Sequence, residues 1–323
     1  MTNRHRRRQR KKCFTIINLI LLLTCTLGIA LIFYLHQNHS QINLSKASRI
    51  IPKISLFAQK DTTSISKSST NKSTIKTSQQ KSAKLNTPKI TWSKQKEPVK
   101  IPILMYHAVH VMAPEEAANA NLIVSPELFE SQIKAMKDAG YYFLSPEEAY
   151  RALSNNELPA KKVVWLTFDD SMIDFYNVAF PILKKYGVKA TNNVITGLTE
   201  KGSAANLTIN QMKEMKNSGM SFQDHTVNHP DLKQSSPDTQ TAEMKESKDY
   251  LDKKLNQKTI AIAYPAGQYS DTTLQIAASL NYKLGVTTNE GVASAADGLL
   301  SLKRIRILPT TNPKTLLATM NQP

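Results

Sequence analysis

The chain has 323 residues, 41% of them hydrophobic, which is enough to form a sizeable core in one or two domains. Its formal net charge is +17, but residues 1–35 contain seven basic residues and no acidic one, residues 36–99 contain twelve against two, and residues 100–323 contain 23 of each. Because residues 100–323 are formally neutral, the charge gives no support for nucleic acid as a partner.

Residues 1–13 are basic, and we predict that they form a cytoplasmic tail. Residues 14–35 that follow are almost wholly apolar and uncharged. This apolar segment is long enough to cross a hydrocarbon core of about 30 Å. Basic residues on its N-terminal side favour a cytoplasmic N-terminus, so we predict a transmembrane signal anchor in the cell membrane, with the rest of the chain outside the cell. A cleaved signal peptide is the alternative, but Tyr34, Leu35 and His36 follow instead of the small residues of a cleavage site.

Residues 36–98 are rich in Ser, Thr, Lys, Gln and Asn and contain few large apolar residues. Such a composition cannot bury enough surface to offset the entropy of the chain, so we predict a disordered stalk. Its evenly spaced lysines fit a solvated, self-repelling spacer, and they also fit electrostatic contact with anionic polymers of a cell wall.

Residues 99–323 contain no cysteine, because Cys13 and Cys25 both lie in or beside the apolar segment, so this region can form no internal disulfide. Short apolar strands alternate with amphipathic helices, which predicts one α/β domain with a parallel sheet. We expect strands at residues 101–106, 141–144, 163–168, 188–195, 220–224, 260–264, 284–287 and 302–308. We expect helices at residues 125–140, 145–153, 172–186, 208–218, 237–255 and 271–281.

The strand at residues 163–168 ends directly in two carboxylates, Asp169 and Asp170. It is short and rich in β-branched and aromatic residues, which predicts burial on both faces. In parallel α/β folds, ligands bind at the carboxyl ends of strands, where these two side chains would lie. The alternative is that one aspartate caps the following helix, which explains one carboxylate but not both.

Two histidines, His225 and His229, follow the strand at residues 220–224. On a helical turn, a spacing of four places both side chains on one side, where they can bind one metal ion. Surface or capping histidines at this spacing are the alternative. With a carboxylate from the first strand they would form a two-histidine, one-carboxylate site, which leaves positions free for water and substrate.

Residues 166–170 together with residues 225–232 resemble the polysaccharide deacetylase family (NodB-homology, carbohydrate esterase 4). Residues 103–107, 189–191 and 263–267 follow the family's motif order, and the resemblance covers residues 101–307. The PILMYH-like first strand is similar to that of the poly-N-acetylglucosamine deacetylases. The resemblance implies that residues 99–323 are a catalytic domain with a distorted, partly open (β/α) barrel of about seven parallel strands.

The resemblance also implies the role of each residue. Asp170, His225 and His229 would bind a divalent metal, usually zinc, and Asp169 would act as general base on the water that the metal activates. The general acid of many members is a C-terminal histidine, which this chain lacks because His229 is its last histidine. His107 matches the N-terminal histidine of PILMYH-type members and is our candidate for the acid, the alternative being a packed residue at a strand end.

The third motif of the family implies that Tyr264, Pro265 and Ala266 contribute to an oxyanion hole or to substrate binding, through a backbone N–H of Ala266. The usual arginine of this motif is missing, which leaves Arg304 and Arg306 as candidates for the partner of Asp169. Three further positions depart from the family pattern: Ser171 replaces glycine, Gln223–Asp224 replaces Gly-Ser, and Asn192–Asn193 replaces aromatic residues.

These observations predict a membrane-anchored, extracellular, metal-dependent hydrolase. Its substrate would be an N-acetylated amino-sugar polysaccharide of the cell surface, peptidoglycan or poly-N-acetylglucosamine, from which it removes N-acetyl groups. Two alternatives remain open. An O-acetyl polysaccharide esterase would use the same metal and base, and a catalytically silent glycan-binding or wall-scaffolding protein would keep the fold without turnover.

Overall fold

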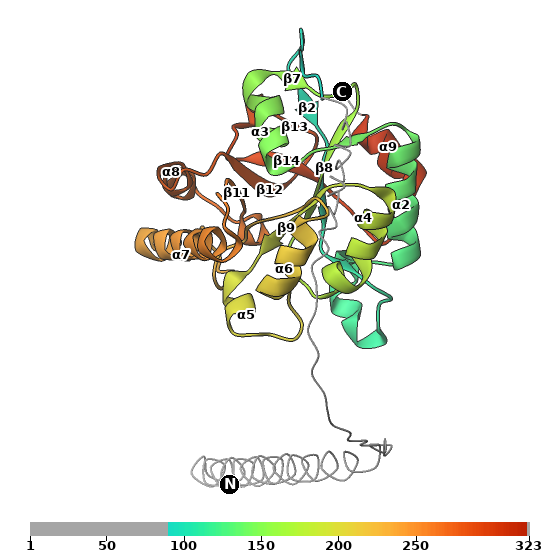
Figure 1. Ribbon diagram of the computed structural model, residues 1–323. Coiled ribbons are helices and arrows are strands. Elements are labelled where there is room, and N and C mark those ends of the chain that lie inside the picture. Colours follow the sequence, from blue (N-terminus) through green and yellow to red (C-terminus); the bar gives the residue numbers. More distant parts are fainter. Residues whose placement is uncertain (1–89, 322–323) are drawn as a thin grey trace, which may run out of the picture. The chain divides into compact units, whose positions relative to one another are not determined.

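Seven parallel strands form a closed ring in the computed structural model, which describes residues 90–321 (Figure 1). In ring order these are β3 (Ile103–Tyr106), β14 (Leu302–Arg306), β12 (Leu284–Glu290), β11 (Ala261–Ala263), β10 (Met220–Asp224), β9 (Ala190–Val194) and β8 (Val163–Phe168). β8 pairs with β3 and closes the ring, and β6 (Tyr142–Phe143) adds to β8 outside it. The predicted seven-stranded (β/α) barrel is confirmed, and it is closed where a partly open barrel was expected.

The weakest contact in the barrel lies between β10 and β11, which share only the Cα pair Asp224–Ile262. The side chain of Gln223 compensates, because its Oε1 accepts hydrogen bonds from the backbone N–H groups of Ile260 (2.9 Å) and Ala261 (2.8 Å). A side-chain carbonyl therefore replaces missing ladder bonds, which is a structural reason for glutamine at this position.

The helices surround the strands in Figure 1. They are α2 (Pro126–Asp138), α3 (Pro146–Asn155), α4 (Phe180–Tyr186), α5 (Thr196–Glu200), α6 (Ile209–Lys216), α7 (Pro237–Leu255), α8 (Asp271–Ser279) and α9 (Pro313–Met320). The predicted helix starts at residues 125, 145 and 208 are confirmed. Ser125, Ser145 and Thr208 cap these helices, and each accepts a hydrogen bond from the backbone N–H three residues later.

The predicted single helix at residues 172–186 is wrong in its first half. A π-helical segment, η2 (Phe175–Ala179), precedes α4, and the N–H of Phe180 bonds to the carbonyl oxygen of Phe175. Pro181 has no N–H and cannot donate the α-helical hydrogen bond to the carbonyl four residues earlier. The chain therefore enters α4 through a wider, π-helical turn.

Several short elements were missed by the sequence analysis. Two are the helices α5 and α9, and a third is η1 (Pro114–Leu122), a 3₁₀ segment. Three two-stranded pairs were also missed: β1 (Ser93–Lys94) with β7 (Glu157–Leu158), β2 (Lys100–Ile101) with β13 (Ala293–Ser294), and β4 (Ala108–Val109) with β5 (Ile123–Val124). Strands of two residues have too few positions to show a period-2 pattern.

The alternation of side chains along β8 positions the site. Trp165, Thr167 and Asp169 share the face that points into the barrel, whereas Leu166 and Phe168 pack outward against the helices. Trp165 fills the lower interior, and its Nε1 donates to Thr191 Oγ1 (2.8 Å). The predicted burial of this strand on both faces is confirmed, since all six residues of β8 are buried.

The predicted boundary of the stalk at residue 98 is too late. Residues 93–94 already form β1, and the Arg151 guanidinium lies 4.4 Å from the ring centroid of Trp92. The predicted anchor at residues 14–35 and the stalk up to residue 89 lie outside the described residues. Between residues 90 and 321, no helix is long and apolar enough to span a membrane.

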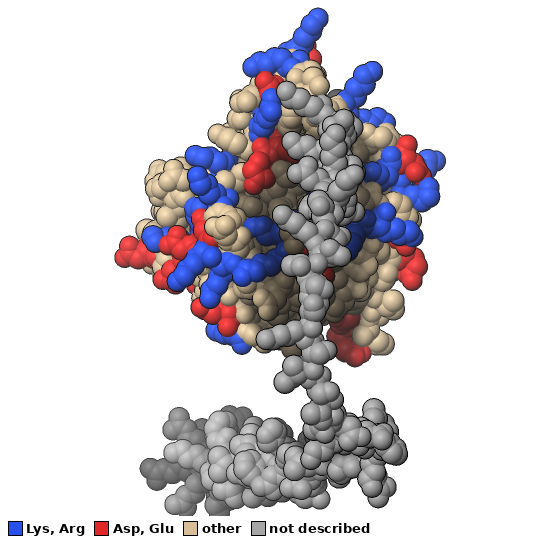
Figure 2. Space-filling model, in the orientation of Figure 1, with Lys and Arg blue, Asp and Glu red and all other residues tan. Residues whose placement is uncertain are grey.

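Figure 2 shows Lys and Arg side chains interspersed with Asp and Glu over the visible face of residues 90–321. This mixture agrees with the formal neutrality of residues 100–323 in the sequence. The visible face therefore offers no uniformly basic surface for a nucleic acid.

Candidate active site

A cavity of about 240 Å³ lies at the carboxyl ends of the barrel strands. It is lined by His107, Leu122, Asp169, Asp170, His225, His229, Tyr264, Ala266, Thr288 and Arg306. Seven of the eight site residues predicted from the sequence are thus brought together from β3, β8, β10 and β11. The eighth, Pro265, is buried between the lining residues Tyr264 and Ala266 and does not itself line the cavity.

Asp170, His225 and His229 form the candidate metal site. One ligand atom from each residue lies within 4.8 Å of the others. The Nε2 atoms of His225 and His229 lie 3.3 Å and 3.7 Å from Asp170 Oδ1. Ligand atoms around a tetrahedral zinc ion lie about 3.3 Å apart, so this spacing and the donor set of two imidazoles and one carboxylate fit such an ion.

A backbone contact fixes the orientation of His225. Its Nδ1 lies 2.7 Å from the carbonyl oxygen of Ala263 and donates to it, since a carbonyl can only accept. Nε2 is therefore the nitrogen that faces Asp170, and its lone pair is available to a metal ion when the ring is neutral. Burial lowers the pKa of His225, but the hydrogen bond that its ring donates to Asp170 and the charges of both aspartates raise it overall.

Residues 225–229 do not form the expected helical turn. The segment is a bend in which Thr226 and His229 have left-handed backbone conformations, with φ of 65° and 58°. This bend still directs both histidines toward Asp170, with 4.8 Å between the ring centroids. Left-handed non-glycine residues are strained and need support from their surroundings.

Two helices provide that support. From α7, the Glu243 carboxylate accepts hydrogen bonds from the backbone N–H groups of Val227 (3.0 Å) and Asn228 (2.8 Å) and from the Asn228 amide (2.7 Å). From α5, the N–H of Gly197 donates to Val227 O (2.9 Å). A Cβ at Gly197 would lie only 2.6 Å from this oxygen, so the close approach requires glycine.

Arg304 is the partner of Asp169 that the sequence left undecided. Its Nη1 and Nη2 donate to Oδ1 (2.9 Å) and Oδ2 (2.7 Å) of Asp169, and the arginine is completely buried inside the barrel. Burial alone would raise the pKa of Asp169, but the Arg304 charge holds it well below its usual value. Asp169 is thus an ionised carboxylate beside the candidate metal ligands.

A further contact to Asp169 was not predicted. The side-chain amide of Asn193, on β9, donates to Asp169 Oδ1 over 2.7 Å, and Asn193 is buried. The sequence contained a signal for this contact, because Asn192–Asn193 departs from the family pattern. Asn193 also lies near the carboxyl end of a strand after which no site residue was predicted.

His107 follows β3 and lines the cavity together with both aspartates. Burial lowers its pKa, and the charges of Arg304 and Arg306 act in the same direction, against Asp169 and Asp170. The imidazole is therefore neutral at pH 7 when no substrate is present.

The residues of the third motif, Tyr264 to Ala266, contribute backbone groups and an aromatic ring to the cavity wall. Tyr264 donates through its hydroxyl to Leu300 O (2.8 Å), which leaves its ring facing the cavity. Ala266 is exposed in the cavity and has a φ of 50°. Ser171, which stands where the family pattern has glycine, and Asp170 before it have φ of 52° and 74°, a backbone region that favours glycine.

Asp224, which replaces a serine of the family pattern, anchors the segment of residues 225–229 through its carboxyl group. It is fully buried and accepts hydrogen bonds from Ser247 Oγ (2.5 Å), from the N–H of Thr226 (2.7 Å) and from the Tyr282 hydroxyl. Burial raises its pKa to about 6. The carboxyl group ties β10 to α7 and to the segment before β12.

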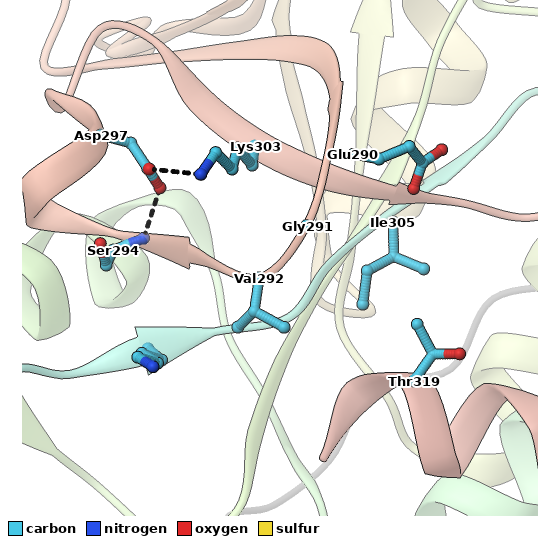
Figure 3. Close-up of a pocket in the computed structure, with 9 residues that line it drawn as sticks. Glu290, Gly291, Val292, Ser294, Asp297, Lys303, Ile305 and Thr319 are labelled. Carbon is cyan, nitrogen blue, oxygen red and sulfur yellow. Dashed lines mark hydrogen bonds and ion pairs between the residues drawn. The ribbon is translucent and has the colours of Figure 1, made fainter. Parts of the chain in front are cut away.

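A larger cavity, about 520 Å³, lies away from these residues (Figure 3). Figure 3 shows Asp297 directed toward Lys303 and the backbone of Ser294, and the Asp297–Lys303 ion pair spans 3.2 Å. Its lining contains no histidine and none of the candidate active-site residues. Size alone would select this cavity, but the candidate catalytic and metal-binding residues converge on the smaller one.

The comparisons with known proteins agree with the motifs. The family profile described as polysaccharide deacetylase matches residues 156–285. The Bacillus subtilis (strain 168) protein named putative polysaccharide deacetylase YxkH is 40% identical over 218 residues, which cover 68% of this chain and 75% of that protein. The poly-beta-1,6-N-acetyl-D-glucosamine N-deacetylase of Staphylococcus aureus (strain MSSA476) is 32% identical over 199 residues, 58% of this chain and 68% of that protein.

A solved structure is also similar. The Streptococcus pyogenes deacetylase PplD in complex with acetate is 81% identical, with a TM-score of 0.69, and the match covers 70% of this chain and 100% of that chain. Because the identity is high over 70% of this chain, the similarity covers the whole barrel and not the motifs alone. This chain therefore belongs to the polysaccharide deacetylase family (NodB-homology, carbohydrate esterase 4) and is an enzyme of that family.

Proposed function

We propose that this enzyme is a metal-dependent hydrolase that removes N-acetyl groups from an amino-sugar polysaccharide of the cell surface. The observation that carries the proposal is the placement of Asp170, His225 and His229 beside an ionised Asp169 in one cavity. The names of the relatives support it: one is an N-deacetylase of poly-beta-1,6-N-acetyl-D-glucosamine, and one was solved with acetate, the product of a deacetylation.

The donor set favours zinc as the metal, because imidazole nitrogen and carboxylate oxygen are common zinc ligands. Within residues 90–321, three protein ligands converge, which is typical of a catalytic site that keeps positions for water and substrate. When bound, the metal would acidify water and polarise the acetamide carbonyl.

The protein residues supply the proton transfers. Asp169 takes a proton from the attacking water while the new C–O bond forms, and the backbone N–H of Ala266 stabilises the oxyanion. His107 gives a proton to the amine nitrogen as the C–N bond breaks, which releases acetate and a free amine. Because His107 starts neutral, it must first take up a proton from solvent, and Asp169 gives the proton that it took back to solvent, so the two transfers balance.

The location of the enzyme is also part of the proposal. Residues 14–35 would anchor the chain in the cell membrane with the N-terminus in the cytoplasm, and the basic stalk would carry the catalytic domain toward its polymer outside the cell. The excess of basic residues before residue 100 would favour anionic wall polymers near the stalk.

The test is an assay of the full chain, purified in detergent and loaded with zinc, on peptidoglycan and on poly-N-acetylglucosamine. We expect acetate release with an equal number of new free amines on one of the two polymers. Acetate without new amines would identify an O-acetyl esterase instead. Glycan binding without acetate release from either polymer, in a chain with full metal content, would identify a silent binding protein.

A further inference from the structure

We propose that Asn193 is a positioning residue that determines which oxygen of Asp169 accepts the proton during deacetylation. The inference rests on the proposed function, and it assigns a role to a residue outside the metal ligands and the proton-transfer pair. Asn193 acts through Asp169, and the cavity lining does not include it.

The hydrogen bonds to Asp169 carry the argument. A carboxylate has about four acceptor positions, two on each oxygen. Oδ1 accepts from Arg304 Nη1 (2.9 Å) and from Asn193 Nδ2 (2.7 Å), so both of its positions are used. Among residues 90–321, Oδ2 accepts only from Arg304 Nη2 (2.7 Å). The remaining acceptor position is therefore on Oδ2, and this oxygen is the base.

The strand fixes the amide of Asn193 in this role. Along β9, Thr191 and Asn193 point into the barrel, where Thr191 meets Trp165 and Asn193 meets Asp169. The nitrogen of the amide must face Oδ1, because the amide oxygen would place two acceptors against each other. Without this donor, both oxygens of Asp169 would have a free acceptor position. The attacking water could then bind to Oδ1 as well as to Oδ2, and binding to Oδ1 would be unproductive.

The test compares three variants of the full, zinc-loaded chain with the wild type between pH 5 and pH 8. Asn193→Ala removes the donor, and we expect kcat to fall about tenfold at every pH with little change in KM. Asn193→Asp keeps the shape but replaces the donor with a carboxylate, and we expect kcat to fall on the order of 100-fold at pH 8.

The pH dependence of the variant-to-wild-type ratio separates positioning from structure. For Asn193→Asp the ratio should rise as the pH falls, because the introduced carboxyl group, once protonated, can again donate to Oδ1. For Asn193→Ala the ratio should stay flat. Asn192→Ala is the matched control, since Asn192 is the adjacent buried asparagine on the opposite face of β9 and its side chain has no hydrogen-bond partner among residues 90–321.

Metal content and the melting temperature are measured for each variant. A flat ratio for Asn193→Asp, or wild-type kcat in Asn193→Ala, would overturn the inference. If Asn193→Asp does not fold, the kcat and KM of Asn193→Ala at full metal content decide the question alone. A wild-type enzyme that releases no acetate contradicts the proposed function itself, whereas an active wild type with unaffected variants contradicts only the role of Asn193.

Discussion

At the scale of single residues, the site consists of charged side chains whose positions are fixed by ion pairs and hydrogen bonds. Arg304 neutralises Asp169 inside the barrel, and Asp170 faces the two histidines. Two adjacent aspartates thus have different environments, one paired with a buried cation and one open to a metal. This difference assigns them different roles and makes their substitutions distinguishable.

The substitution Asp169→Asn should abolish the base and leave the metal bound. We expect kcat to fall by roughly 10² to 10⁴ with unchanged zinc content, measured by acetate release and by elemental analysis. The same change leaves the Arg304 guanidinium buried without its counter-charge, so the free energy of unfolding should fall by about 3 kcal/mol. Asp138→Asn, which removes an exposed partner of Lys134, is the control and should change neither quantity appreciably.

His107→Ala tests the proposed acid. We expect the metal content and the melting temperature to stay close to those of the wild type, while kcat falls by roughly 10² to 10⁴. The comparison with Asp170→Ala is informative, because that variant should lose the metal as well as the activity. Near-normal turnover in His107→Ala would mean that another group protonates the amine.

At the scale of elements, the segment of residues 226–229 depends on α5 and α7 for its shape. Its left-handed residues gain no stabilisation from a regular helix, and the Glu243 carboxylate supplies three of the hydrogen bonds that hold it. The histidine spacing alone therefore does not form the site.

Glu243→Gln should loosen this segment, because the neutral amide accepts weaker hydrogen bonds than the carboxylate. We expect the dissociation constant for zinc to rise about tenfold, measured by competition with a chelator, while the melting temperature of the metal-free protein changes little. Glu246→Gln, an exposed glutamate on the same helix, is the matched control. Equal zinc affinity in the two variants would contradict the role of Glu243.

A second element-scale feature joins the end of β4 to η1 and to the turn before η2. His110 lies between two carboxylates, with Nδ1 2.8 Å from Asp174 Oδ2 and Nε2 3.1 Å from Glu116. Burial lowers the pKa of His110, but the hydrogen bonds to Asp174 and Glu116 raise it overall. The imidazole is partly exposed, so solvent screens these interactions.

This cluster predicts a pH dependence of stability. Because the folded pKa of His110 lies above the unfolded value of about 6.5, its contribution is complete below that pH and is lost as the pH rises through the folded pKa. His110→Gln should therefore lower the free energy of unfolding by about 0.5–1 kcal/mol more at pH 6 than at pH 9. Denaturant titrations at the two pH values measure this difference, and an equal effect at both would contradict it.

At the scale of the whole molecule, the sequence separates a basic N-terminal part from a neutral enzyme. The proposed anchor implies a measurable arrangement: protease added to intact protoplasts should cut the stalk and release the catalytic domain. Mass spectrometry of the untreated protein should still find residues 14–35. Recovery of a shortened chain from the culture medium would contradict anchoring.

The barrel, His107, Tyr264 and Ala266 were expected from the family resemblance. The sequence by itself determined the α/β class, most strands and helices, and the carboxylates and histidines at two strand ends. These features depend on local signals, such as the period of apolar residues, capping residues, and carboxylates or histidines directly after a strand. Because the carboxyl ends of parallel strands meet at one end of a barrel, the motifs converge whatever their separation in the chain.

Only the tertiary structure decided between Arg304 and Arg306, and only it revealed Asn193 and Glu243. Both arginines have the same parity on β14, so period-2 alternation cannot separate them; their depth in the barrel does, since Arg304 is buried and Arg306 lines the cavity. Asn193 and Glu243 lie 24 and 15 residues from the groups they bind. Such contacts depend on strand register and helix packing, which are set by the whole core and leave no periodic trace in the sequence.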